Sequence, residues 1–350
     1  MIKLEKGFTL LELMISISLG LLIVAAGTAI FLSGQRSMNM QVGMGDVQQN
    51  AIFGLSILAH DLRHSNLNTV SDQQINNKIP GSGVVFKKEN FPSNVSGISG
   101  LEANSVTIQN KNDDATQGKS DQLVIQFVPE YTVTSTTATV ENPDQSSKDV
   151  TTVTSTGNLF DCEGNTIKFS VDNNDSTSLV TNTQSPNAVY PVIVQRYFVQ
   201  KMPNDQQVTG QPDKYALYCD AGFYKPDSST IEGLGQNAQQ LMQNIEAFKI
   251  RFGVKAPNGK LRYMTVDQYN AIMPSTVVDQ KDYYQIESID IGLLARSSTS
   301  IGNQSSLNSQ TEFNIAGTNV TLKVNTKNSQ YIRQALSQVV AIRNTLGAAS

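Results

Sequence analysis

The Gly7-Phe8 junction and the acidic residue that follows it could support peptide cleavage and ion pairing. Glu12 lies four residues after Phe8 and carries the only formal charge between Phe8 and Leu32. Cleavage of the Gly7–Phe8 bond would leave an α-amine on Phe8. A carboxylate in hydrocarbon costs about 2.5–3.5 kcal/mol, so it requires a partner. The spacing predicts that Glu12 pairs with an α-ammonium, either its own or that of a neighbouring subunit.

The only two histidines, His60 and His64, flank Asp61 at the spacing of a helical zinc pair. A catalytic zinc site needs a third protein ligand, and the short Asp61 side chain would hold its carboxylate away from metal-bound water. The pair also lies at the end of an amphipathic helical pattern. We therefore expect solvated histidines on a helix surface and no metal.

Two further segments resemble ligand-binding patterns. Gly233–Ala238 fits a relaxed dinucleotide fingerprint, but no buried parallel strand leads into it and no βαβ unit follows. We expect a turn and a helix start there. Asp172–Asp175 supplies oxygen ligands but lacks the glycine and the final glutamate of a calcium loop. A polar turn is the default, with weak calcium binding as the alternative. We expect no cofactor and no enzymatic activity.

The apolar run after Gly7 must position Glu12. Phe8–Leu32 contains 25 residues, and as a helix it would be about 37 Å long, enough to span a bilayer. Lys3 and Lys6 precede it and favour a cytoplasmic N-terminus, so the rest of the chain should lie on the far side. A secretory signal cut after Ala29 would leave Glu12 unexplained, and a plain anchor would leave the Gly-Phe junction unexplained.

The segment Gly7-Phe8-Thr9-Leu10-Leu11-Glu12 resembles the prepilin signature of type IV pilins and type II secretion pseudopilins. The resemblance implies cleavage after Gly7 and N-methylation of Phe8 by a prepilin peptidase. It also implies that Glu12 neutralises the terminal amine of a neighbouring subunit while apolar helices bundle into a filament core.

A helical pattern resumes after Leu32, with apolar residues three and four positions apart. One long helix is the simplest structure, ending at 66–68. Three glycines should soften or kink it. We expect a leader at 1–7, a membrane and filament-core helix at 8–32, an amphipathic continuation at 33–66, and a globular periplasmic head at 67–350. The apolar face consists of Met44, Val47, Ala51, Leu55, Leu58 and Leu62, and the glycines are Gly34, Gly43 and Gly45.

The head reads as a mostly antiparallel sheet on which the helix packs, a pilin-like α+β fold. Short helices are expected at 238–248 and 265–273, and 331–344 fits either a strand or a helix. Residues 69–120 read as long loops with a short strand at 84–86, and 141–149 and 172–187 as turn-rich segments. Strands are expected at 122–128, 131–140, 166–171, 192–200, 215–219, 247–254 and 284–295, with a strand pair at 313–324.

The two cysteines, Cys162 and Cys219, lie in the part of the chain expected outside the cytoplasm. A lone pair in an oxidising compartment usually forms a disulfide, here stabilising the fold by about 4 kcal/mol on the chain-entropy model. Two free thiols and a metal site are the alternatives. The formal charge of −4 with no basic cluster makes nucleic-acid binding a poor hypothesis.

Several downstream segments resemble, in order, landmarks of PilW-type minor pilins. That resemblance implies a low-copy subunit of an initiating complex at the pilus tip, which supports twitching motility, adhesion or DNA uptake. Its partners would be other minor pilins, the major pilin, prepilin peptidase and the inner-membrane assembly platform. The segments are 50–66, 120–123, 160–164, 242–254, 288–297 and 340–344.

Two alternatives to this interpretation remain open. One is a minor pseudopilin of type II secretion, in which the protein would contact exported substrates. The other is an adhesive or sensory module, in which the polar loops at 69–120 and 141–190 bind a surface ligand.

Overall fold

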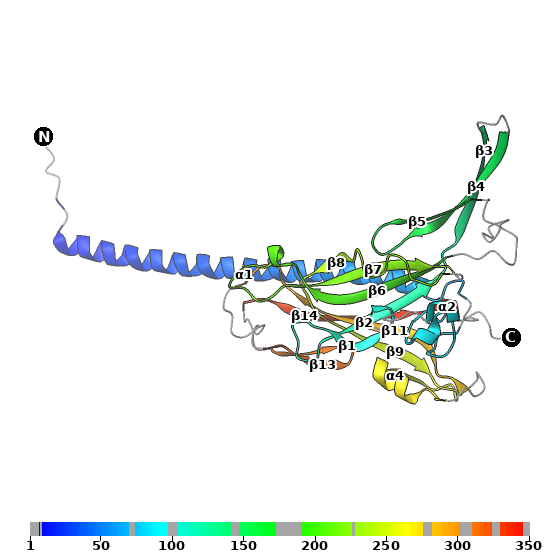
Figure 1. Cartoon of the computed structure of the whole chain (residues 1–350). Coiled ribbons are helices and arrows are strands. Elements are labelled where there is room, and N and C mark those ends of the chain that lie inside the picture. The colour runs from blue at the N-terminus through cyan, green and yellow to red at the C-terminus, as the bar shows by residue number, and fades with distance from the viewer. Residues whose placement is uncertain are drawn as a thin grey trace.

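One long helix extends from a β-rich head in the computed structural model of the chain (Figure 1). The start of α1 lies at one end of the molecule and the head at the other. The structure describes residues 7, 9–69, 74–96, 104–141, 147–172, 191–225, 228–275, 282–301, 310–323 and 330–345.

Helix α1, Leu10–His64, is unbroken over 55 residues. Thr9 caps its start, and its end is marked by Ser65 and by Asn66, whose φ of 68° lies in the left-handed region. Asparagine tolerates that conformation better than most residues, so it ends a helix readily. The predicted single helix and its end are therefore confirmed.

The α-helix continues without a break through all three glycines, where the sequence predicted a softer or kinked helix. At Gly43 the structure gives another reason for the glycine. A Cβ atom there would lie 3.1 Å from Ile301 Cγ2 and 3.5 Å from Ile332 Cδ1. The absence of a side chain lets the helix approach the head closely.

The apolar face of the second half of α1 is buried as predicted, except that Met44 remains 43% exposed where the helix leaves the head. Gly54 is also buried and packs on Met242. The buried side chains join the main core, which draws on strands of both large sheets. This face consists of Val47, Ala51, Leu55, Leu58, Ala59 and Leu62.

The glycines of α1 give a paired prediction. Gly54→Val should destabilise the protein by about 1–3 kcal/mol, because a Cβ there would overlap the buried Met242 side chain. Gly45→Ala is the control, since a Cβ at that position meets open space. Alanine should stabilise the helix there by up to about 1 kcal/mol. Urea unfolding of the detergent-solubilised protein would measure both, and equal effects would contradict the packing argument.

Two antiparallel sheets form the head. The order of the larger sheet is β1-β2-β6-β7-β8, and that of the smaller is β10-β9-β11-β14. Helix α1 contacts β8, an edge strand of the larger sheet, and β14, an edge strand of the smaller sheet. The larger sheet comprises β1 Ile108–Asn112, β2 Ser120–Phe127, β6 Val192–Lys201, β7 Tyr215–Tyr224 and β8 Gln239–Gln243; the smaller comprises β9 Ile245–Lys255, β10 Leu261–Met264, β11 Gln285–Arg296 and β14 Arg333–Ala341.

Smaller elements complete the head. A three-stranded sheet, β3-β4-β5, projects away from it (Figure 1), and the hairpin β12-β13 forms a fourth sheet. The antiparallel α+β fold is therefore confirmed. These strands are β3 Tyr131–Glu141, β4 Ser147–Phe160, β5 Thr166–Asp172, β12 Glu312–Ile315 and β13 Thr318–Thr321; the helices are η1 Lys88–Asn90, α2 Ser93–Ser96, η2 Asn204–Gln206, α4 Val266–Ile272 and η5 Arg343–Thr345.

Most predicted strands and the helix α4 are confirmed, but the helix predicted at 238–248 is wrong. That segment forms β8 and the start of β9, separated by Asn244 with a φ of 54°. Leu217 pairs with Met242 across the sheet, so pairing with β7 outweighs the helical spacing of the apolar residues. The ambiguous segment 331–344 is strand β14 followed by η5.

The predicted loop regions contain more structure than expected. Strand β1 lies within 69–120, and β4 begins inside the segment predicted as a turn at 141–149. The predicted strand at 84–86 is reduced to a bridge between Val84 and Ile125. In β4 the run of five β-branched residues at 150–154 is a strand signal that was missed. Most of the turn predicted at 172–187 lies outside the described residues.

Cys162 and Cys219 form the predicted disulfide, with Cα atoms 6.1 Å apart. It joins the turn between β4 and β5 to strand β7. Cys219 is fully buried in the main core. The projecting three-stranded sheet is thus attached covalently to the larger sheet.

Removing the disulfide should lower the free energy of unfolding by about 4 kcal/mol, because the bridge closes a long loop in the unfolded chain. Cys162→Ser is the better variant, since Cys162 is only partly buried. Reducing the wild-type protein should give a similar loss, and reducing the variant should give no further loss. Unfolding in urea with and without reductant measures this, and an unchanged midpoint would contradict it.

Candidate functional site: the exposed N-terminal helix

Thr9 and Glu12 are bonded to each other at the start of α1. The Thr9 backbone N–H and hydroxyl donate to Glu12 Oε2 at 3.0 and 3.1 Å, and the Glu12 N–H donates to Thr9 Oγ1 at 3.2 Å. This is a capping box, in which two backbone donors at the helix start are satisfied reciprocally. The Glu12 carboxylate, which the sequence predicted to need a partner, therefore has a hydrogen-bond partner, Thr9, within the single subunit.

The structure gives little on Gly7 and Phe8, the other two residues predicted at this site. Gly7 is exposed, and Phe8 lies outside the described residues. Sequence reasoning missed Thr9, although the pattern Thr-x-x-Glu before an apolar run is a known signal for a capping box. The structure therefore adds Thr9 as the residue that orients the Glu12 side chain.

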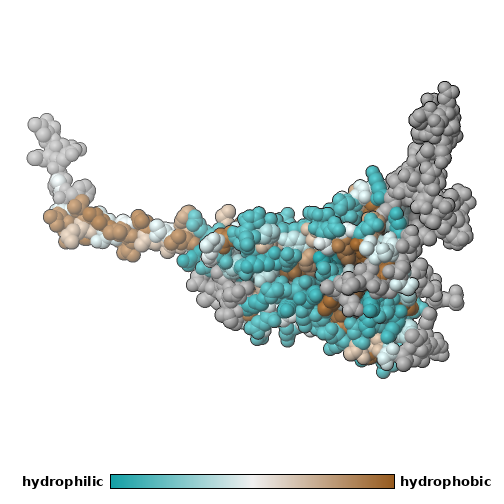
Figure 2. Space-filling view, viewed as in Figure 1, coloured by the Kyte–Doolittle hydropathy of each residue, from teal (hydrophilic) through white to brown (hydrophobic). Residues whose placement is uncertain are grey.

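The first half of α1 is apolar and exposed on all sides. Leu10 is 77% exposed and Ile30 74%. In Figure 2 hydrophobic side chains dominate the part of α1 outside the head, whereas hydrophilic residues dominate the visible surface of the head. By length and composition this helix could cross a membrane. Such an apolar surface is stable only when lipid or other apolar chains cover it.

The hydroxyl groups in this exposed segment are satisfied inside the helix. Ser16 Oγ donates to the Glu12 carbonyl at 2.7 Å, Ser18 Oγ to the Met14 carbonyl at 2.8 Å, and Thr28 Oγ1 to the Ala25 carbonyl at 2.9 Å. A polar group in hydrocarbon is costly unless it is hydrogen-bonded. The hydroxyl groups of Ser16, Ser18 and Thr28 therefore keep a hydrogen bond when the helix enters an apolar environment.

Polar contacts fix the second half of α1 to the head. Asn50 Nδ2 donates to the Gln243 carbonyl at 2.5 Å. Ser298 donates to Asp46 Oδ2 through its N–H at 3.1 Å and also through its hydroxyl. Together with the buried apolar face, these contacts make the helix and the head one unit, so a force on the helix is transmitted to the head.

The ring centroids of the histidine pair, His60 and His64, lie 4.7 Å apart. His60 is exposed, while His64 is half-buried and its ring lies 6.2 Å from that of Phe127. Asp61 is directed to the head, where its Oδ2 accepts from the Tyr197 hydroxyl at 2.9 Å. Burial raises the pKa of Asp61. Among the described residues no group of three histidine, cysteine or acidic side chains could hold a metal ion.

The glycine pair of the dinucleotide-like pattern lies in a turn, as predicted. Gly233 and Gly235 have φ values of 85° and 90°. The Gly235 N–H donates to both carboxylate oxygens of Asp220 at 2.9 Å, and Asp220 pairs with Arg196 at 2.8 Å. The chain then enters strand β8 and not a helix. The loop is anchored by a buried ion pair and serves the packing of the sheet.

The candidate calcium segment is only partly described. Asp172 ends strand β5, and residues 173–175 lie outside the described residues. Weak calcium binding at 172–175 therefore stays a hypothesis.

Two protein-family models match the chain, one in the head and one at the N-terminal helix. A family model described as "Type IV Pilus-assembly protein W" matches residues 196–344, which include most of the strands in the two large sheets. A second model, for the prokaryotic N-terminal methylation motif, matches residues 2–28, the start of α1. No curated protein and no solved structure matches the chain. These two matches, on an exposed apolar helix and on the β-rich head that it carries, support a type IV minor pilin of the PilW family.

Proposed function

We propose that this protein takes part in starting type IV pilus assembly, as a low-copy subunit of a tip or priming complex. The observation that carries the proposal is the exposed apolar helix with one acidic side chain at its start. The large head adds surface for contacts with other pilus components. The role is structural and needs no cofactor and no catalysis by this chain.

The pairing of Glu12 explains how a subunit would enter the filament. After cleavage between Gly7 and Phe8, prepilin peptidase would methylate the new amine of Phe8. Within the described part of the single subunit, the Glu12 carboxylate accepts from Thr9. In an assembling bundle the terminal ammonium of a neighbouring pilin is a stronger partner, because a charge-assisted pair gains strength in an apolar environment.

The proposed topology follows the helix. Residues 1–7 would be removed, 8–32 would lie first in the inner membrane and then in the filament core, 33–66 would carry the head, and 67–350 would form the periplasmic head. The Cys162–Cys219 disulfide supports an oxidising compartment for the head. The partners would be other minor pilins, the major pilin and the inner-membrane assembly platform, with no direct contact to nucleic acid.

Deleting the gene tests the proposed function. We expect loss of surface pili, twitching motility and DNA uptake, with normal secretion of enzymes, and recovery when the gene is supplied again. Normal piliation with loss of secreted enzymes would instead identify a pseudopilin of type II secretion. Sequencing the mature N-terminus should find methylated Phe8. A protein that begins at Met1 or after Ala29 would contradict the mechanism.

The projecting sheet β3-β4-β5 favours a second candidate function, adhesion. It extends from the head on the side away from the start of α1 (Figure 1), where a tip subunit would contact a surface. Deleting residues 132–156 should leave piliation intact and abolish attachment if this sheet binds a ligand. Unchanged attachment would exclude that role for the sheet.

A further inference from the structure

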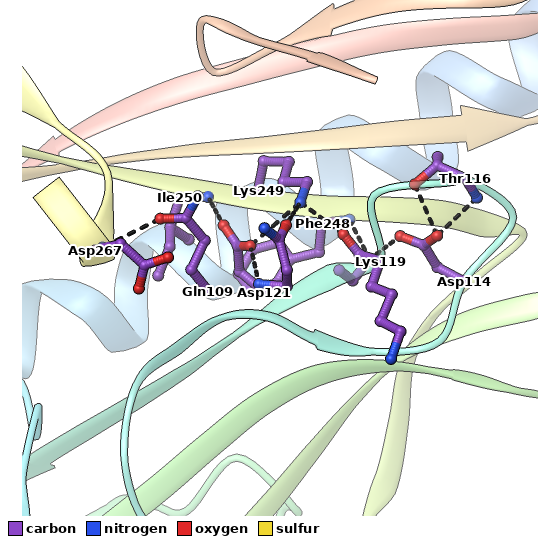
Figure 3. Close-up of polar contacts among 11 residues, drawn as sticks. Gln109, Asp114, Thr116, Lys119, Asp121, Phe248, Lys249, Ile250 and Asp267 are labelled. Atoms are coloured by element: carbon purple, nitrogen blue, oxygen red, sulfur yellow. Dashed lines mark hydrogen bonds and ion pairs between the residues drawn. The ribbon is translucent and has the colours of Figure 1, made fainter. Parts of the chain in front are cut away.

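Lys249 is a buried lysine on β9 at the junction of the two large sheets. It is 2% exposed, and its Nζ lies 2.6 Å from Asn110 Oδ1, 2.6 Å from the Lys119 carbonyl oxygen and 3.3 Å from Asp121 Oδ1. Figure 3 shows Lys249, Lys119 and Asp121 meeting at this point. A lysine amine is thus held against a side-chain amide and a buried carboxyl group.

The backbone around this amine is held in unusual conformations. Asn110 and Lys119 have φ values of 53° and 57°, in the left-handed region, which asparagine tolerates but lysine rarely adopts. Both direct an oxygen at Lys249 Nζ. The register of β1 against β2 also shifts between Ile108 and Asn112. Strained positions of this kind concentrate at functional sites, where the surrounding structure holds them.

Asp121 connects the two groups. Its Oδ1 accepts from the Asn110 backbone N–H at 2.9 Å, and its Oδ2 accepts from the Ile250 backbone N–H at 3.0 Å. Asp121 is itself 2% exposed. Burial raises its pKa, so the carboxylate accepts a proton more readily than an exposed aspartate. The Asp121 carboxyl oxygen Oδ1 lies 3.3 Å from Lys249 Nζ, within reach of a direct proton transfer.

We propose that Lys249 and Asn110 join in an intramolecular amide cross-link, with Asp121 carrying the proton. The carbonyl bond is about 1.23 Å long, so the Asn110 Cγ lies within about 3.8 Å of Nζ, close to the separation of a near-attack geometry.

The reaction balances without a co-reactant. Asp121 takes a proton from the Lys249 ammonium, and the neutral amine attacks Asn110 Cγ to form the new C–N bond. The proton then passes through Asp121 to Asn110 Nδ2, the Cγ–Nδ2 bond breaks, and ammonia leaves. Asp121 takes the second proton from the new amide nitrogen and passes it to the ammonia, so Asp121 ends as a carboxylate and the products are the amide and ammonium. Asn110 lies at the exposed edge strand β1, which gives the ammonia a path to solvent.

The cross-link would join two segments that are 139 residues apart in the sequence. It would tie the edge of the larger sheet to β9 of the smaller one. A fibre subunit under tension could then not separate its two sheets along this line. This inference depends on the Lys249 cluster alone, so it holds or fails independently of the role in pilus assembly.

Intact mass spectrometry of the purified full-length protein tests the cross-link. The wild-type mass should be lower by one ammonia than the mass of its mature disulfide-bonded chain. Lys249→Arg and Asn110→Ala should each lack this loss, after correction for the substitution. Lys111→Arg, on the same edge strand, is the matched control and should retain it. A wild-type protein without the loss would overturn the proposal, whatever the variants do.

Peptide mapping and a third variant locate the bond and the proton carrier. Trypsin should not cleave after Lys249, and one branched peptide should contain Lys249 and Asn110. Recovery of peptides that end at a free Lys249 from folded wild-type protein would contradict the proposal. Asp121→Asn should give a protein that keeps its disulfide but contains unlinked Lys249. Full cross-linking in that variant would exclude Asp121 as the proton carrier.

Discussion

Glu12→Gln is expected to reduce incorporation of the protein into pili about 100-fold while leaving membrane insertion intact. The variant removes the carboxylate, so the terminal ammonium of a neighbouring subunit would lie unpaired among apolar helices. Charges in hydrocarbon cost about 2.5–3.5 kcal/mol, and each 1.4 kcal/mol corresponds to a factor of ten. Immunoblots of sheared pili and of membranes from the same cells measure the two quantities.

Glutamine is chosen because it separates two roles of Glu12. Glu12 caps the helix through Thr9, and glutamine can form the same capping box. Glu12→Gln therefore changes the charge and preserves the helix start, whereas Glu12→Ala and Glu12→Leu lose both. All three variants should be defective if the charge is what matters.

Thr9→Ala is the matched control. It removes the hydroxyl that contacts Glu12, at a cost of about 1 kcal/mol in helix stability, but it leaves the carboxylate free to pair. We expect near-normal incorporation. A strong defect in Thr9→Ala together with normal incorporation of Glu12→Gln would show that capping, and not charge pairing, governs assembly.

Glu246→Gln should lower the free energy of unfolding by about 3–5 kcal/mol, because it removes the buried carboxylate that the Arg296 and Arg333 side chains share. Glu246 is fully buried at the start of β9. Its Oε1 accepts from Arg296 at 3.1 Å, and its Oε2 accepts from Arg333 Nε at 2.5 Å. The two arginines belong to β11 and β14, so one carboxylate joins three neighbouring strands.

Glu287→Gln is the control for Glu246→Gln. Glu287 pairs with Lys255 at 3.2 Å, but both side chains are partly exposed. Exposed pairs contribute about 0–1 kcal/mol. Urea unfolding of the two variants should therefore differ by several kcal/mol. Equal and small losses would mean that water reaches the arginines and that the cluster is not a buried charge site.

Much of the fold could be predicted because the signals are local. The apolar run of 8–32 and the three- and four-residue spacing after it specify one helix. The alternation in 284–295 and the Gly317 turn specify strands that the structure contains. The failures arise where local spacing conflicts with pairing. Residues 238–248 fit a helix, yet the pairing of β8 with β7 and of β9 with β11 makes them parts of two strands.

The candidate site could also be predicted from the sequence because its signals are local. Its residue types and spacing suffice to predict Gly7, Phe8 and Glu12 as a processing and pairing site, because cleavage motifs and membrane spans are read from adjacent residues. The model for the N-terminal methylation motif matches the segment that carries this pattern.

The sequence by itself determined the exposed apolar helix, the acid at its start and the cysteines that bridge. Only the tertiary structure decided that Lys249, Asn110 and Asp121 meet, that Glu246 lies between two arginines, and that Gly43 and Gly54 serve packing. The physical reason is how far apart in the sequence the interacting residues lie. Helix periodicity and membrane partition depend on neighbouring residues, whereas a buried charge needs partners that only the pairing of distant strands brings close.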